Sequence, residues 1–89
     1  MKRTVPTGKF KKDLKRIRKR GWDIHALEAI VSLLQLGAQL PENAFPHKLS
    51  GEYKGDWECH IAPDWLLIYD VTDAEIILAR TGSHADLFE

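Results

Sequence analysis

Apolar residues in the first part of the chain recur at the spacing of an amphipathic helix. Phe10, Leu14 and Ile17 stand at positions i, i+4 and i+7 of a segment whose other positions are mostly lysine and arginine. This spacing predicts a helix with one apolar face. Thr7 is a suitable N-cap for the helix and Gly21 a suitable C-terminal stop.

A second helix is predicted directly after the first. It begins at about Trp22 or Asp23 and ends at Leu36, before Gly37. Because one glycine joins the two segments, we expect the helices to form an antiparallel hairpin. The apolar stripe of the second helix consists of Ile24, Leu27, Ile30, Val31 and Leu34.

The second half of the chain is rich in β-branched and aromatic residues between turn signals, which is typical of strands. The long strand segments read "GDWECHIA", "WLLIYDVT" and "EIILARTGS", and "RTVP" and "HKLS" are candidates for short strands. Pro63-Asp64 and Asp73-Ala74 are candidate two-residue turns. We therefore predict one α+β domain over residues 1–89, in the order β-α-α-β-β-β. An N-terminal strand and a two-helix antiparallel hairpin would pack on an antiparallel sheet, followed by a short C-terminal tail or helical turn.

Two-residue turns also predict which side chains share a face of the sheet. They place Ala62 opposite Trp65 and Thr72 opposite Glu75. The rows that follow are His60–Leu67–Arg80 and Glu58–Tyr69–Leu78. This face should be open to a ligand, whereas the opposite, more apolar face should lie under the helices. The opposite face holds Trp57, Cys59, Ile61, Leu66, Ile68, Ile77 and Ala79. A longer turn or a β-bulge would change this register.

The charge of the chain is divided between its two parts. Residues 1–20 contain ten Lys or Arg and one acid, Asp13, for a net charge of +9, and the remaining residues carry −9. A basic end of this kind suggests a polyanion or an acidic partner, although a solvated helix face explains it equally well.

Compartment and membrane signals point to the cytoplasm. The start, "MKRTVPTGKFKKDLK", has no apolar core of a secretory signal, and no run approaches about 18 apolar residues. A lone cysteine, Cys59, cannot form an internal disulfide, which fits a reducing compartment.

Three histidines in the β half are candidates for proton-transfer chemistry. His47, His60 and His84 lie on or next to predicted strands, and Asp64 follows His60 in a turn, whereas His25 reads as a surface residue. RNA cleavage through the ribose 2′-hydroxyl needs a base, an acid for the 5′-oxygen and a cation for the phosphorane. Histidine suits both proton roles, and this chemistry requires no metal. A zinc site is the rival interpretation, but a paired spacing such as H-x-x-x-H is absent. A third interpretation is structural: the histidines only cap turns and fill gaps in the packing.

Motifs in the second half resemble those of the YafQ branch of the RelE/ParE superfamily of bacterial type II toxin–antitoxin toxins. "PHKLSGEYKGDWECHIAPDWLLIYDV" contains a histidine before L-x-G, an acid two residues before a second histidine, and then P-D-W-x-L-I-Y. "RTGSHADLFE" supplies the terminal R-T-G-S-H-x-x-L-F. The motifs cover about residues 44–89, and the basic first helix and helical hairpin match by architecture.

The resemblance implies a RelE-like fold and a toxin that cleaves mRNA in the ribosomal decoding site without a cofactor. It also implies a cognate antitoxin that neutralises the toxin, in a complex that binds operator DNA. Glu58 departs from the pattern, since some relatives have aspartate at this position. Carried over residue by residue, the family's site corresponds to His47, Glu58, His60, Asp64, His84 and Phe88.

The catalytic candidates have distinct expected roles. His84 is the first candidate for general acid or base. Asp64 and His60 are adjacent around one turn, so Asp64 could orient His60 or act as the base itself. His47 could bind the phosphate or share the proton transfer.

The remaining candidates would bind substrate. Arg80 could stabilise the phosphorane charge. Phe88 could stack on a base or pin the tail to the sheet. Glu58 could contact substrate or be an exposed cross-strand partner, and Lys48 and Lys54 could contact phosphates. The basic first helix could lie on ribosomal RNA or meet the antitoxin. Toxins of this kind are often net basic, so the zero net charge of this chain favours docking through the helices alone.

An alternative from a different class is a non-enzymatic inhibitor. Relatives in the same superfold poison DNA gyrase, so the fold does not decide the function. The three histidines and Asp64 favour cleavage, because an inhibitor needs no proton-transfer groups. A module that only binds its antitoxin and the operator is a further alternative.

Overall fold

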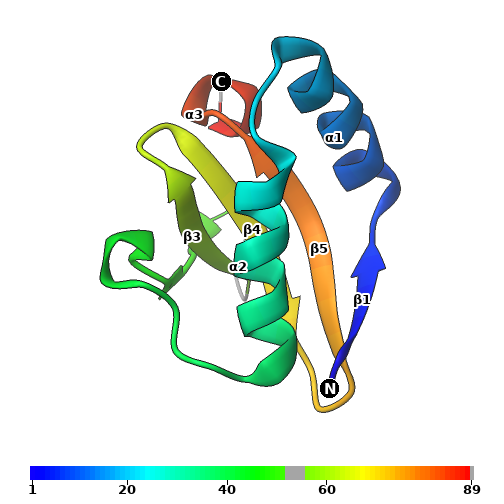
Figure 1. Cartoon of the computed structure of the whole chain (residues 1–89), viewed down its shortest axis with the longest axis vertical. Helices are drawn as coiled ribbons and strands as arrows, with labels where there is room; N and C mark the ends of the chain where they lie inside the picture. The colour runs from blue at the N-terminus through cyan, green and yellow to red at the C-terminus, as the bar shows by residue number, and fades with distance from the viewer. Residues whose placement is uncertain (52–55, 89) are drawn as a thin grey trace.

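A computed structural model describes residues 1–51 and 56–88 of the chain. Two long helices and a mixed sheet account for most of these residues (Figure 1). The elements are β1 (Arg3–Pro6), α1 (Gly8–Arg20), α2 (Ile24–Leu36), η1 (Glu42–Ala44), β2 (His47–Lys48), β3 (Trp57–Ala62), β4 (Trp65–Val71), β5 (Glu75–Gly82) and α3 (His84–Phe88). No helix in these ranges is long and apolar enough to span a membrane.

Local capping signals determine where the two long helices begin and end, as the sequence predicts. The Thr7 hydroxyl accepts a hydrogen bond from the Phe10 N–H, and α1 ends at Gly21 in the left-handed conformation. Asp23 caps α2, which ends at Gly37. The predicted apolar stripes of both helices contribute to one core cluster.

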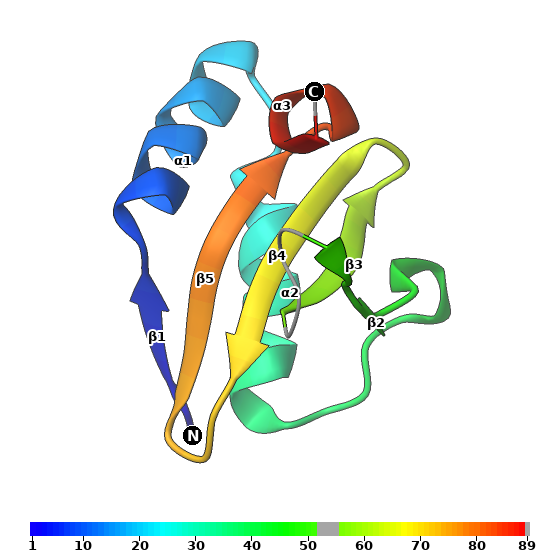
Figure 2. The ribbon, with the colours of Figure 1, turned by 180° about the vertical axis from the view of Figure 1, so that it is seen from behind.

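The sheet has the strand order β1-β5-β4-β3-β2. Strands β2 to β5 pair antiparallel, whereas β1 runs parallel to β5. Helices α1 and α2 run in opposite directions, and α2 crosses the face of the sheet seen in Figure 1. Seen from behind, neither long helix lies in front of the sheet, and α3 stands at the end where β5 finishes and β3 turns into β4 (Figure 2).

Two β-bulges make part of the predicted register wrong. Both turns are as expected, because Ala62 pairs with Trp65 and the Thr72 N–H donates to the Glu75 carbonyl at 2.9 Å. The register shifts between His60 and Ala62 and again between Ile68 and Tyr69. The observed rows are His60–Leu66–Gly82 and Glu58–Ile68–Arg80, while Tyr69 does pair with Leu78 as predicted.

Each bulge inserts one extra residue and so reverses the faces of the strand beyond it. Leu66 and Ile68, which we expected under the helices, lie on the face of His60 and pack with Leu87. Ala79 also packs against this second cluster. Leu67 and Tyr69 join the helix-side core instead. His60, Glu58 and Arg80 still share a face, because the two shifts offset each other between β3 and β5.

Candidate active site

Four rings, from β3, α3 and the loop after η1, are neighbours at the end of the sheet where α3 lies. The centroids of His60 and His84 are 6.2 Å apart, and those of His84 and Phe88 are also 6.2 Å apart. The Phe45 ring also neighbours His60, with a centroid distance of 6.3 Å and its plane nearly perpendicular to that of His60. This arrangement therefore brings two predicted proton-transfer residues together, next to two aromatic side chains.

Asp64 in the β3–β4 turn pairs with His84 at the start of α3. Its Oδ1 accepts from the His84 backbone N–H at 3.0 Å and lies 2.8 Å from the ring Nδ1. Both hydrogen bonds lower the pKa of the Asp64 carboxyl, and the bond from the His84 backbone has the larger effect. Because an ionised carboxylate only accepts hydrogen bonds, Nδ1 carries the proton, and Nε2 is the ring nitrogen left for a substrate. Asp64 therefore orients His84, whereas the sequence suggested His60 as its partner.

A second histidine–carboxylate pair lies on β2 and β3. His47 Nδ1 is 2.9 Å from the Phe45 carbonyl oxygen, and Nε2 is 3.4 Å from Glu58 Oε1. Both ring nitrogens therefore lie near oxygen atoms, and the contact of Nδ1 with the Phe45 carbonyl is the hydrogen bond of the two. The Glu58 side chain is buried behind the half-exposed His47. It is therefore not an exposed cross-strand partner.

Arg80 is held by an acid that sequence reasoning did not single out. Its Nε and Nη2 donate to the two carboxylate oxygens of Asp13 at 2.6 and 3.1 Å, and the Thr81 N–H donates to the same carboxylate at 3.2 Å. Asp13 is 2% exposed. Asp13 stands three residues after Phe10, so the helical spacing already places its side chain on the buried face of α1. This spacing is the signal in the sequence that could have identified Asp13.

The short helix α3 is attached to the rest of the molecule by burial and by charge. Leu87 is buried against Leu66 and Ile68, so the clasp that we considered for Phe88 is made by its neighbour. Arg20 of α1 donates to both carboxylate oxygens of Asp86, at 2.6 and 2.8 Å. Phe88 itself is 47% exposed.

A capping box and a glycine support the same helix. The Ser83 N–H donates to the Asp86 carboxylate at 2.9 Å, and the Asp86 N–H donates to the Ser83 hydroxyl at 3.1 Å. A Cβ on Gly82 would lie 2.8 Å from Asp86 Oδ2, so the close approach of this carboxylate requires glycine.

The other predicted residues lie at the margin of the site or outside it. Lys48 is exposed on β2, with its Nζ 5.8 Å from the centroid of the Trp57 ring. His25 is an exposed residue of α2, and Cys59 is fully buried on the helix side of the sheet. Lys54 lies outside the described residues.

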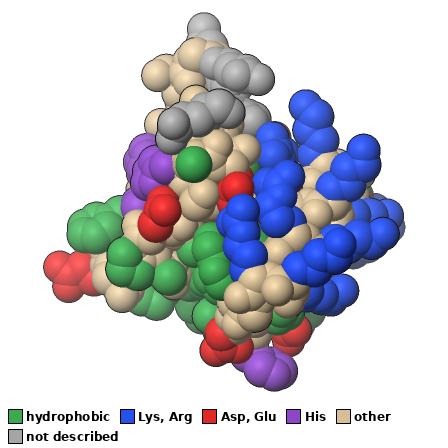
Figure 3. Space-filling view, turned by 90° about the horizontal axis from the view of Figure 1, so that it is seen from above, with side chains coloured by type: hydrophobic (Ala, Val, Ile, Leu, Met, Phe, Trp, Pro, Cys, Tyr) green, Lys and Arg blue, Asp and Glu red, His purple; other side chains and the backbone are tan. Residues whose placement is uncertain are grey.

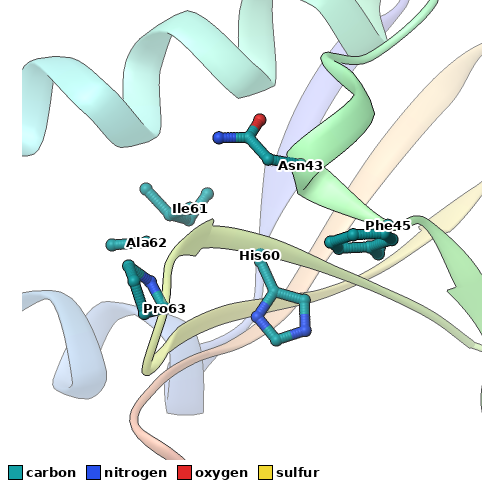
Figure 4. Close-up of a pocket in the computed structure, with 6 residues that line it drawn as sticks. All are labelled: Asn43, Phe45, His60, Ile61, Ala62 and Pro63. Carbon is teal, nitrogen blue, oxygen red and sulfur yellow. The ribbon is translucent and has the colours of Figure 1, made fainter.

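His60 also lines a cavity of about 410 Å³, together with Asn43, Phe45, Ile61, Ala62 and Pro63 (Figure 4). Sequence reasoning missed Phe45, since an aromatic residue in a loop carries no periodic signal.

Lysine and arginine side chains gather on one side of the end of the molecule seen in Figure 3, and histidine side chains gather on the other. The exposed basic residues of α1 are Lys9, Lys11, Lys12, Lys15, Arg16, Arg18, Lys19 and Arg20. A polyanion that crosses this end could contact both groups.

Across residues 1–51 and 56–88, no three His, Cys, Asp or Glu side chains gather where they could hold one ion. Asp64 Oδ1 and His84 Nδ1 are already joined by a hydrogen bond.

Comparisons with known proteins agree with the resemblance in the motifs. Residues 2–89 match the family model described as "Bacterial toxin of type II toxin-antitoxin system, YafQ". The chain is 40% identical over 84 residues to the mRNA interferase toxin YafQ of Escherichia coli strain K12, covering 92% of this chain and 90% of the relative.

Solved structures match over nearly the whole chain. The crystal structure of the E. coli DinJ–YafQ toxin–antitoxin complex matches with a TM-score of 0.90 and 37% identity, covering 99% of this chain and 98% of the other. The crystal structure of a metal-bound toxin from Helicobacter pylori matches with a TM-score of 0.92 and 37% identity, covering 99% and 100%.

Proposed function

The chain belongs to the YafQ family of bacterial type II toxin–antitoxin toxins, and on this premise we propose that it is an endoribonuclease that cleaves mRNA on the ribosome, in the cytoplasm. The observation that carries the proposal is the Asp64–His84 pair, with His60 beside it. It directs one ring nitrogen of an exposed histidine to the substrate, next to a second group able to transfer a proton.

Cleavage would proceed through the ribose 2′-hydroxyl. A base removes the 2′-hydroxyl proton, the 2′-oxygen attacks phosphorus, and an acid protonates the 5′-oxygen as its bond to phosphorus breaks. His84 acts through Nε2 as one of these groups, and His60 is the candidate for the other. The ring separation of 6.2 Å lets one phosphodiester contact both histidines.

The basic and aromatic residues have supporting roles. His47 contacts a phosphate oxygen through Nε2, because Nδ1 is already hydrogen-bonded to the Phe45 carbonyl, whereas Nε2 lies 3.4 Å from Glu58 Oε1. Arg80 stabilises the negative charge that develops on the phosphorane. Because its guanidinium is also paired with Asp13, this role depends on the contact between α1 and β5. Phe88 stacks on a base, and Lys48 contacts the RNA backbone.

Partners follow from the family and from the charge distribution. A cognate antitoxin neutralises the toxin, as the DinJ–YafQ complex supports by analogy. The complex of toxin and antitoxin binds operator DNA. The basic face of α1 lies on ribosomal RNA when the toxin is active.

RNA end mapping in a purified translation reaction tests the proposal, with wild type and His84→Ala compared with and without ribosomes. We expect cuts within codons only when ribosomes are present. Because general acid–base catalysis contributes about 10²- to 10⁴-fold, His84→Ala should lower the rate by that factor. It should fold normally, since the His84 side chain is 55% exposed.

Three further arms decide between the alternatives. If the mutant unfolds, His84 is a structural residue. If wild type makes no cuts but stops growth, the gyrase-inhibitor hypothesis is favoured. If wild type neither cuts RNA nor stops growth, the hypothesis of a purely regulatory module is favoured. TPEN, which removes zinc and copper but leaves the magnesium that ribosomes need, should not slow cleavage. Inhibition by TPEN that added zinc or copper reverses would show that a bound metal takes part.

A further inference from the structure

Phe45 adopts a backbone conformation that a bulky residue rarely occupies. Its φ is +45°, in the left-handed region, and its side chain is 63% exposed. A large apolar ring gains little in stability from exposure, and the left-handed backbone costs free energy as well. Neither local preference nor core packing accounts for this position, so a ligand contact is the natural explanation to test.

The strained backbone of Phe45 also serves the site directly. Its carbonyl oxygen accepts the hydrogen bond from His47 Nδ1 at 2.9 Å. Its ring plane stands at 87° to that of His60. In an edge-to-face pair at most one face of a ring is contacted, so the exposed Phe45 ring keeps a face on which a flat group can stack.

The cavity beside this ring has the lining of a site for a flat, partly polar molecule. Its volume is about 410 Å³, within the range of small-molecule sites. Ile61, Ala62 and Pro63 form its apolar wall, and His60 connects it to the proposed catalytic centre. The Asn43 side chain comes from η1 and lies on the Ile61 side of the lining (Figure 4).

We propose that this cavity binds one nucleobase of the mRNA next to the cleaved phosphodiester, with Phe45 as the stacking platform and Asn43 as the residue that reads the edge of the base. This inference rests on the proposed ribonuclease function. A nucleobase is favoured as the occupant because His60 both lines the cavity and belongs to the proposed catalytic centre, so a nucleotide bound at the histidines places its neighbour here. The Asn43 amide offers both a donor and an acceptor, which is what a base edge requires.

Steady-state cleavage of mRNA on programmed ribosomes tests the platform. Phe45→Asn removes the ring but accepts the left-handed backbone, so it should fold at least as well as wild type. We expect kcat/KM to fall roughly 5- to 150-fold, mainly through KM, the range measured when one base loses its stacking partner. Phe45→Trp should retain most of the activity. Leu36→Ala is the matched control, since Leu36 is 64% exposed and belongs to the C-terminal end of α2.

RNA end mapping tests the reading of the base. Asn43→Asp replaces the amide donor with a second acceptor, so the distribution of cuts among codons should change at one position next to the cleavage site, and Asn43→Ala should broaden it.

If wild type cuts and both the Phe45→Asn kinetics and the Asn43→Asp cut pattern equal wild type, the base subsite is wrong while the ribonuclease proposal stands. If Phe45→Asn weakens antitoxin binding and leaves cleavage intact, the surface belongs to the antitoxin and the subsite is overturned. If wild type makes no cuts, both proposals fall.

Discussion

Single side chains at this site are distinguished by their hydrogen-bond partners more than by their type. His84 and His47 each face a carboxylate, but through different ring nitrogens. Asp64 contacts Nδ1 of His84, whereas Glu58 contacts Nε2 of His47. The first arrangement leaves Nε2 of His84 for proton transfer, and the second places the His47 ring between a carbonyl oxygen and a buried carboxylate. Two histidines of one short sequence therefore take different chemical roles because of the atoms they face.

The Asp64–His84 contact predicts a specific defect in Asp64→Asn. The asparagine amide can donate to Nδ1 and so favour the tautomer with the proton on Nε2, the wrong one for a base. We expect kcat to fall within the roughly 10²- to 10⁴-fold range of acid–base catalysis, with a smaller change in KM and an unchanged unfolding midpoint.

Two comparisons separate this effect from a general defect. Asp73→Asn, in the other two-residue hairpin turn, should cut like wild type. In a His84→Ala background, Asp64→Asn should lower the rate little further, because the two residues act as a unit. Additive losses in the double variant would mean that Asp64 acts independently of His84.

At the level of elements, the site depends on a five-residue helix that could not persist alone. Helix α3 is retained by Leu87 in the second apolar cluster and by the Arg20–Asp86 ion pair to the end of α1. The same helix carries His84 and Phe88. Docking of α3 is therefore a condition for the catalysis that we propose.

The charge on Asp86 makes this docking sensitive to acid. The hydrogen bond from Arg20, followed by bonds from Ser83, holds the pKa of the Asp86 carboxyl well below its ordinary value. A lowered native pKa contributes stability that is complete above the unfolded pKa of about 3.9 and is lost as the pH falls through the native value. We expect Asp86→Asn to lower the free energy of unfolding by about 1–3 kcal/mol at pH 7, and the difference from wild type to shrink below about pH 4.

Urea unfolding of wild type and Asp86→Asn from pH 7 to pH 3 measures this difference. Arg20→Gln and the double variant complete the cycle, and the two single losses should not add. Equal differences at pH 7 and pH 3, or fully additive losses, would show that the ion pair does not hold α3.

The whole molecule separates a basic side from the histidine site at one end of the sheet (Figure 3). Part of the basic helix is neutralised internally, since Arg16 and Arg20 lie against Asp13 and Asp86. The lysines of α1 remain exposed, which explains how a chain of zero net charge can still present a surface for phosphates.

Ribosome binding should therefore weaken steeply with salt and depend on these lysines. We expect log K to fall linearly with log salt concentration, and Lys12→Gln, Lys15→Gln and Lys19→Gln each to reduce the slope by about one unit without changing codon preference. Co-sedimentation with ribosomes from low to high salt measures the slope. Arg3→Gln is the control, because Arg3 is already paired with Glu75 at 2.8 Å. A flat salt dependence would remove α1 from the docking surface.

Local signals in the sequence determined the elements of this protein and pointed to many of the residues of its candidate site. Thr7, Gly21 and Gly37 mark the helix ends, and the turns at residues 63–64 and 73–74 mark the hairpins, because capping and turn geometry depend only on a few neighbouring residues. The motif histidines were recognisable because their spacing is written in the chain.

Only the tertiary structure decided which faces and partners these residues have. The bulges next to Ile61 and Ala79 leave no mark in the alternation, yet they moved Tyr69 into the core and Leu66 to the site face. Asp64 pairs with His84 and Arg80 with Asp13 across 20 and 67 residues of sequence. Such contacts depend on how whole surfaces pack, and this information is distributed over the chain and is not held in any short segment of it.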